Sequence, residues 1–301
     1  MNGPFIGKTT AGLGRVRPRV LYPGYRNNWK IFQIMDQDRS GRVATKVGVL
    51  DKAMAVLHSF SGEDTHLNPR TVAERTGLSL PTAYRLMQAL GEHGLLEKEG
   101  TDYRLGVALL HLGRRVADSI EVRHQVLPHL RWLRDRTQEN AELHVRRSES
   151  RVPVEIICGP QSLRPFVEVG EPLALHVGAS GKTLLAWLPP AEQDALAAAS
   201  AARFDESGPY ERAALRRDLI RVRDQGWADT DGERCPGVAA VSAPIFDARG
   251  EVAGAVVLSG PSVRLPARKR RSLASLVREA AAGTSRDLGY PGERPSGREA
   301  I

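Results

Sequence analysis

The sequence has few cysteines, no long apolar run and no apolar leader. Its two cysteines, Cys158 and Cys235, lie far apart without CxxC spacing, which argues against a disulfide framework or a zinc site. No apolar stretch approaches the roughly 18 residues needed to span a bilayer, and the first residues lack the apolar core of a secretory signal. We therefore expect a cytoplasmic protein without a membrane partner, a structural metal or a cofactor.

Motifs for catalysis and nucleotide hydrolysis are also missing. The chain has no GxSxG or HExxH pattern, and four of its histidines (His124, His129, His144 and His176) are scattered, so we predict no catalytic residues. Residues 178–183 read GASGKT, but a phosphate-binding P-loop needs glycine where this chain has His176. This segment instead offers backbone N–H groups at a helix N-terminus, which suit a carboxylate or a similar anion.

The net charge of +8 is unevenly distributed along the 301 residues. Residues 1–46 hold nine Lys and Arg against two Asp, whereas residues 47–105 hold six Lys and Arg against eight Asp and Glu. The first segment lacks sustained periodicity and is predicted to be a disordered basic extension, as is a tail over 291–301. We expect translation to begin at Met35, with a basic arm that touches DNA as the alternative.

Two short helix patterns separated by a tight turn lie within residues 68–93, after a scaffolding helix over 49–60. Asn68 and Pro69 suit the start of the first helix, and Gly77 suits its left-handed end. The second helix begins near Ser79, and its expected buried stripe consists of Leu80, Ala83, Leu86, Met87 and Leu90. This layout is typical of a DNA-reading helix-turn-helix.

The opposite face of the second helix is where we place the contacts to DNA bases. It carries Ser79, Pro81, Thr82, Tyr84 and Arg85. Residues 95–106 then predict a β-hairpin, the wing, with Lys98 and Arg104 available to phosphates. The winged helix would span residues 47–105. The alternative is that this face is an ordinary solvated surface of a three-helix core.

The remaining chain predicts a linker helix and a mixed domain. The helix over 106–120 is apolar on more than one side and is a candidate for dimer contact, and the next helix is expected to break or restart at Pro128. Strands are predicted at 142–146, 152–158, 166–169, 238–246 and 252–259, and helices at 180–188, 191–202, 210–225 and 267–288. We therefore expect a two-domain α+β protein whose second domain spans 121–290.

Three segments together carry a family resemblance. They are LSLPTAYRLMQALGEHGLLEKEGTDYRLG, HVGASGKTLLAWLP and PGVAAVSAPIFDARGEVAGAVVLSGP. In this order they resemble the isocitrate lyase regulator (IclR) family of bacterial transcription factors. Within that family the sequence is most similar to actinobacterial NdgR-type members. The resemblance implies a winged helix that binds palindromic operators, a dimerising linker helix and a GAF-like domain that binds small organic acids.

The resemblance also implies a set of effector contacts. They correspond to Gly178, Ala179, Ser180, Thr230, Glu233, Ala239, Ala240, Val257 and Ser259. At Ala240, Thr230 and Val257 the family's type member has Cys, Asp and Ser, so the resemblance implies a less polar pocket here. We expect a larger, partly apolar acid, such as an amino acid or an aromatic acid, to fit better than glyoxylate.

The predicted function is a ligand-responsive regulator of carbon or amino-acid metabolism genes, a repressor rather than an activator. Its partners would be double-stranded operator DNA, a small organic acid or amino-acid-like effector, and further copies of itself in a homodimer or a tetramer. The alternative is a small-molecule-binding protein whose winged helix contacts protein, favoured by the net negative charge of residues 47–105. No motif supports an enzyme.

Overall fold

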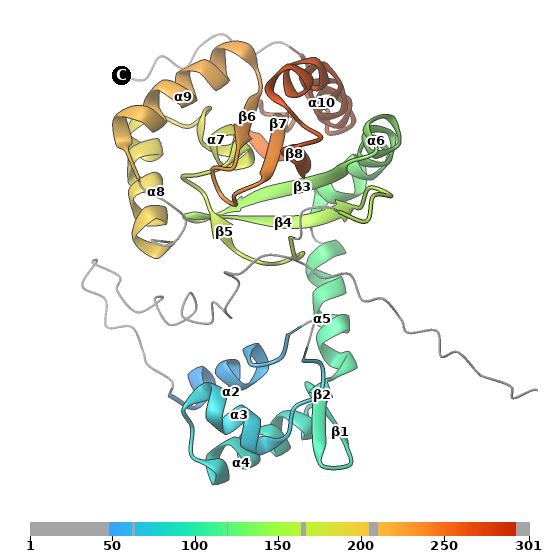
Figure 1. Cartoon of the computed structure of the whole chain (residues 1–301), viewed down its shortest axis with the longest axis vertical. Coiled ribbons are helices and arrows are strands. Elements are labelled where there is room, and N and C mark those ends of the chain that lie inside the picture. The colour runs from blue at the N-terminus through green and yellow to red at the C-terminus, as the bar shows by residue number, and fades with distance from the viewer. Residues whose placement is uncertain (1–47, 62–63, 119, 164–166, 205–209, 293–301) are drawn as a thin grey trace, which may run out of the picture.

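The computed structural model describes residues 48–61, 64–118, 120–163, 167–204 and 210–292. The predictions for residues 1–46, and for the tail beyond residue 292, lie outside these ranges. Within them, the hydrophobic core of an N-terminal unit is separate from the cores of a C-terminal unit (Figure 1). No described helix combines the length and the apolar character that crossing a membrane requires.

The N-terminal unit is a winged helix-turn-helix. Its elements are α2 (Gly48–His58), α3 (Pro69–Thr76), α4 (Leu80–Glu92), β1 (Leu96–Glu99) and β2 (Asp102–Leu105). The Asn68 side chain accepts a hydrogen bond from the Thr71 N–H (2.9 Å), Pro69 opens α3, and Gly77 ends it with a φ of +69°. The capping signals in the sequence therefore locate the turn between α3 and α4.

The core of this unit includes Val56, Val72, Met87 and Tyr103, all buried. The prediction that Leu80 is buried was wrong, because its side chain is 49% exposed. Leu80 is the first residue of α4, and helical spacing fixes the direction of a side chain but not whether a neighbouring element covers it.

The helix α5 (Val107–Asp118) joins the two units, and α6 (Glu121–Thr137) is the first helix of the C-terminal unit. In α5 the large apolar side chains of Val107, Leu110, Leu112 and Val116 are all more than half exposed. The next helix, α6, runs unbroken through Pro128, contrary to the expected interruption. Proline removes one backbone donor from a helix, and here the packing of Val126, Leu130 and Leu133 into the core holds the helix together on both sides.

The C-terminal unit is built on a six-stranded antiparallel sheet of order β5-β4-β3-β8-β7-β6. Its strands are β3 (Asn140–Arg147), β4 (Ser150–Ile157), β5 (Leu173–Ala174), β6 (Ala228–Asp231), β7 (Val238–Phe246) and β8 (Val252–Pro261). One face packs on α6 and α10 (Ala267–Asp287), and the other on α7 (Ala179–Leu185), with α8 (Pro190–Arg203) and α9 (Arg212–Gln225) outside it (Figure 1).

The α+β prediction is confirmed, with errors at the short strands. Residues 167–169 of the predicted strand 166–169 form no strand, and β5 and β6 were not predicted. The sequence of β6, ADTD, lacks the apolar alternation that marks a half-buried strand, and the two residues of β5 are too few to show a pattern.

Candidate functional site

The outer face of α4 carries most of the side chains predicted to contact DNA. Pro81, Tyr84 and Arg85 are exposed, and Thr82 is half-buried. The hydroxyl of Ser79, at the N-cap, lies 2.8 Å from the hydroxyl of Thr82 and caps no backbone N–H. The two hydroxyls are therefore hydrogen-bonded to each other. Arg85 supplies positive charge on this face.

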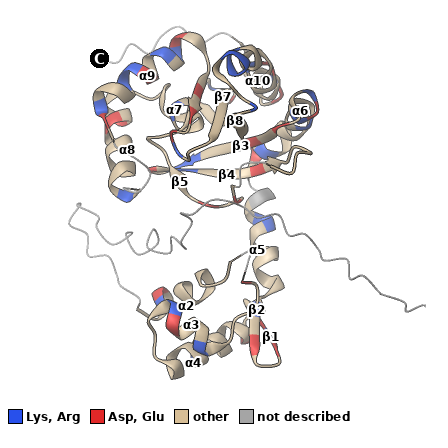
Figure 2. Ribbon diagram, in the orientation of Figure 1, with Lys and Arg blue, Asp and Glu red and all other residues tan. Residues whose placement is uncertain are grey.

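The wing is less available to phosphates than its sequence implies. Arg104 forms ion pairs with Glu97 (2.8 Å) and Glu99 (3.0 Å), and Lys98 lies 6.0 Å from the ring centre of Tyr103. The Val107 N–H and the Arg104 guanidinium lower the pKa of Glu97, which keeps this carboxylate charged. In Figure 2 the ribbon of β1 is coloured red for acidic residues, and little of α4 is coloured blue for basic ones. The structure thus places Arg104 at the wing with its charge already neutralised.

A small pocket lies where α7 begins, against the face of the sheet formed by β3, β7 and β8. Seven of the predicted effector residues line it: Gly178, Ala179, Ser180, Thr230, Ala240, Val257 and Ser259. Five ionisable side chains that were not predicted line it too, namely Glu142, His144, Arg151, Arg234 and Cys235. The pocket is therefore more polar than the three substitutions at Thr230, Ala240 and Val257 imply.

A buried hydrogen-bonded chain forms one wall of this pocket. The Nε2 of His144 lies 2.8 Å from Glu142 Oε2, its Nδ1 lies 2.9 Å from Ser180 Oγ, and Ser259 donates to the other Glu142 oxygen. Arginine can only donate, so the approach of Arg151 Nη1 to His144 Nδ1 (3.4 Å) makes Nδ1 the acceptor and Nε2 the protonated nitrogen. His144 is then neutral and donates to the Glu142 carboxylate.

The pKa shifts agree with this protonation. Burial lowers the pKa of His144, more than the adjacent Glu142 carboxylate raises it. Burial acts to raise the pKa of Glu142, but the hydrogen bonds from His144 and from the Ser259 hydroxyl leave it below its usual value. The buried Glu142 carboxylate is therefore stabilised by two hydrogen-bond donors, His144 and Ser259.

Arg151 brings a positive charge into the same pocket. Its side chain is only 3% exposed, and Nη2 donates to the Val177 carbonyl (3.3 Å). Gly178 has a φ of +84°, and a Cβ there would lie 3.0 Å from Arg151 Nη2. Glycine at this position therefore allows both the left-handed backbone and the passage of the guanidinium.

Two predicted effector residues are not in the pocket lining. Glu233 pairs with the buried Lys182 Nζ at 2.8 Å, which Asp218 also contacts at 2.7 Å. Ala239 is fully buried on the opposite face of β7 from Ala240, since side chains alternate along a strand. The structure therefore does not bring Glu233 and Ala239 together with the other seven residues at this pocket.

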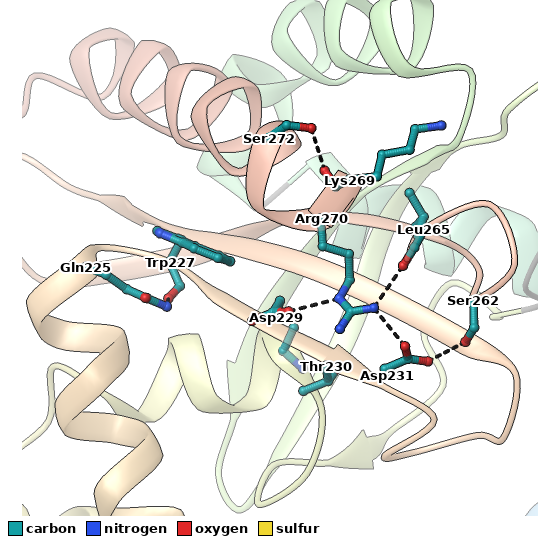
Figure 3. A network of polar contacts seen from close by, with 11 residues as sticks. Gln225, Trp227, Asp229, Thr230, Asp231, Ser262, Leu265, Lys269, Arg270 and Ser272 are labelled. Carbon is teal, nitrogen blue, oxygen red and sulfur yellow. Dashed lines mark hydrogen bonds and ion pairs between the residues drawn. The ribbon is translucent and has the colours of Figure 1, made fainter. Parts of the chain in front are cut away.

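Thr230 is held in the pocket by the strand residues on either side of it. Its hydroxyl accepts a hydrogen bond from the Ala179 N–H (3.2 Å). On the other side of β6, Arg270 of α10 donates to Asp229 (2.9 Å) and Asp231 (2.8 Å), as Figure 3 shows. The two ion pairs of Arg270 therefore fix the position of the edge strand β6. Because Thr230 lies between Asp229 and Asp231, Arg270 is a positioning residue for Thr230.

The missed pocket residues had a recognisable signal. Glu142 and His144 are two residues apart in β3, so both side chains point to the same face of the strand. The residues that follow each of them, Leu143 and Val145, belong to the hydrophobic core. Two polar residues at this spacing in an otherwise buried strand indicate a polar cavity. Arg151 and Arg234 had no such signal, because only the fold brings β4 and the loop after β6 to the same place.

The chain resembles known regulators over most of its length. Residues 49–100 match the IclR helix-turn-helix domain, and residues 114–286 match the C-terminal domain of the bacterial transcriptional regulator IclR. The HTH-type transcriptional regulator XynR of Escherichia coli (strain K12) is 30% identical over 80% of this chain and 97% of its own. The glycerol operon regulatory protein of Streptomyces griseus is 32% identical over 82% and 98%.

Solved structures show the same architecture. Thermotoga maritima IclR aligns with a TM-score of 0.67 at 25% identity, covering 81% of this chain and 99% of its own. An IclR homologue from Microbacterium hydrocarbonoxydans, complexed with 4-hydroxybenzoate, shares the fold with a TM-score of 0.67 at 24% identity, over 80% and 98%.

A winged helix joined to an α+β unit with a polar pocket defines a two-domain transcriptional regulator that binds DNA. Both halves of one family's architecture match here, in the expected order. The chain belongs to the IclR family of bacterial transcriptional regulators.

Proposed function

We propose that this regulator is a repressor of carbon or amino-acid metabolism genes whose operator binding is controlled by a small organic acid. The observation that carries the proposal is the pair of guanidinium groups, Arg151 and Arg234, in the pocket beside α7. Two arginines suit a carboxylate ligand, because the guanidinium fork matches carboxylate geometry. Val167, Leu173 and Val238 add apolar lining, which favours an acid larger than glyoxylate.

We divide the chain into a DNA-binding unit over 47–105, a linker over 106–120 and an effector unit over 121–290. The effector would shift the protein between arrangements that bind the operator and arrangements that do not, in proportion to its difference in affinity for the two. We also propose a relationship to NdgR-type members, based on the three segments quoted above.

The proposed operator contact predicts the result of changing Arg85. The Arg85→Ala variant should bind DNA from upstream of its own gene about 1–3 kcal/mol more weakly, because a bidentate contact to guanine is lost. Fluorescence anisotropy over a salt series measures this. Gln88→Ala, one turn further along α4 and also exposed, is the matched control. Specific binding that is equal in all three proteins would remove Arg85 from the interface, and a chain without specific binding would favour a protein partner.

The exposed face of α5 supports assembly as a homodimer or tetramer. Leu110 is 75% exposed, and burial of such a side chain in an interface contributes about 1.5–3 kcal/mol. The Leu110→Glu variant should dissociate at least tenfold more readily, because it buries an unpaired charge in the contact. Sedimentation equilibrium measures the change. Val263→Glu, at a position 84% exposed in the other unit, serves as the control, and a Leu110→Glu protein that assembles like it would place the interface elsewhere.

A further inference from the structure

A hollow on the N-terminal unit lies between the first residues of α3, the first residues of α4 and the turn of the wing. Leu80, Pro81 and Tyr84 of α4 form one side, Pro69 and Arg70 of α3 the other, and Thr101 the end. The exposed wall of the hollow is almost entirely apolar. It is a separate feature from the effector pocket and involves none of its residues.

The apolar side chains that line this hollow are exposed and do not belong to the hydrophobic core of the N-terminal unit. Leu80 is 49% exposed and Tyr84 45% exposed, although both belong to a helix whose opposite face is buried through Ala83, Met87 and Leu90. Single exposed leucines are common. Here Leu80 and Tyr84 lie with Pro81 around one depression at the start of a recognition helix, which is the part that meets base edges in a major groove.

From this arrangement we infer that Leu80, Pro81 and Tyr84 read thymine, by packing against its 5-methyl group. In the major groove thymine is the base that presents a methyl group, and apolar side chains are the groups that contact it. The inference rests on the proposed operator binding and adds a base preference to it. Duplex DNA is the occupant that the surroundings favour, because Arg70 borders the hollow and Arg85 lies next to Tyr84 on the same helix.

The polar side chains near the hollow are not expected to contact the thymine methyl group. The hydroxyls of Ser79 and Thr82 lie 2.8 Å apart and hold each other. Arg85 is suited to a guanine or a phosphate. The operator half-site is therefore expected to contain a thymine next to the base or phosphate that Arg85 contacts. The protein would distinguish this thymine from other bases by apolar contacts to its methyl group and not by hydrogen bonds.

Exchanging thymine for uracil in the DNA tests this, because the exchange removes the 5-methyl group and keeps every hydrogen-bonding group. The full-length protein first selects duplexes from a random-sequence pool, and the selected DNA is copied with either thymidine or deoxyuridine nucleotides. We expect roughly fourfold weaker binding for each contacted methyl group removed, the effect of one methyl-sized apolar group, and roughly tenfold or more for a symmetric dimer with two contacts.

Variants separate the methyl contact from general effects of uracil on the duplex. Leu80→Ala should bind thymine DNA more weakly and lose much of the preference over uracil DNA, whereas Arg70→Ala should weaken binding to both DNAs equally. Leu80 is half exposed, so its replacement leaves the core intact. Equal affinity of the unaltered protein for both DNAs, or a full preference retained by Leu80→Ala, overturns the inference and leaves operator binding standing. A chain that enriches no sequence overturns both.

Discussion

The Arg151→Met variant is expected to lose nearly all of its affinity for the organic-acid effector, and with it the effector's control of DNA binding. Arg151 is buried and its guanidinium is held against Val177 and His144, so it presents its charge to the pocket in a fixed direction. Hydrogen bonds to a charged partner contribute about 1.5–3 kcal/mol each, and a bidentate pair makes two. A loss of roughly 100-fold or more in affinity follows from removing both.

Calorimetric titration with a panel of acids measures this loss. The panel contains glyoxylate, an amino acid and an aromatic acid, and the unaltered protein is expected to prefer one of the two larger compounds. Arg151→Lys keeps the charge without the planar fork and should bind at an intermediate level. Arg146→Met removes an arginine from β3 outside the pocket and should bind normally. Undiminished affinity in Arg151→Met, with a normal thermal unfolding curve, would place the carboxylate elsewhere.

The N-terminal unit could be predicted well from the sequence because local interactions define it. Asn68, Pro69 and Gly77 act within a few residues of their own positions, so their identities alone locate α3 and its turn. The exposure of Leu80 could not be predicted in this way. It depends on which element lies across the start of α4, and helical periodicity contains no information about that.

The effector pocket could be predicted only in part, for the opposite reason. Its walls include residues from all six strands of the sheet, from α7 and from the loop after β6. The resemblance to a family identified segments such as 178–180, but Ala239 and Ala240 differ only in the face of one strand. The charges at Arg151 and Arg234 enter through the fold, since each comes from a segment without a motif of its own.

The His144→Ala variant is expected to be less stable by about 2–4 kcal/mol, because it removes a hydrogen-bond donor from a buried carboxylate and leaves a cavity. The side chains of Glu142 and His144 are 2% and 3% exposed, so water does not replace the lost donor. The Ser259 hydroxyl remains the other donor to Glu142. Urea denaturation at neutral pH measures the free energy of unfolding.

A double variant shows whether the carboxylate is the cause. Glu142→Gln added to His144→Ala removes the buried charge and should restore part of the lost stability, since a neutral amide needs less solvation than a carboxylate. The two changes should therefore be strongly non-additive. Additive losses would mean that His144 contributes packing alone.

The same pair makes stability depend on pH in a definite direction. Burial lowers the pKa of His144 below its ordinary value of 6.5, so the unfolded chain takes up a proton more readily than the folded one. Its contribution to stability is present above pH 6.5 and is lost as the pH falls below 6.5 towards the lowered pKa. Glu142, whose pKa lies below its ordinary value of 4.5, adds a further loss as the pH falls below 4.5.

The unaltered protein should therefore lose stability between pH 7 and pH 5.5, and the His144→Ala variant should lose less over the same interval. Some dependence remains in the variant, because burial also lowers the pKa of His58 and of His176. His124→Ala, at an exposed position on α6, is the control variant. An equally steep decline in His144→Ala and the unaltered protein would contradict a neutral His144 in the folded state, since a histidine that is already protonated gains no proton on unfolding.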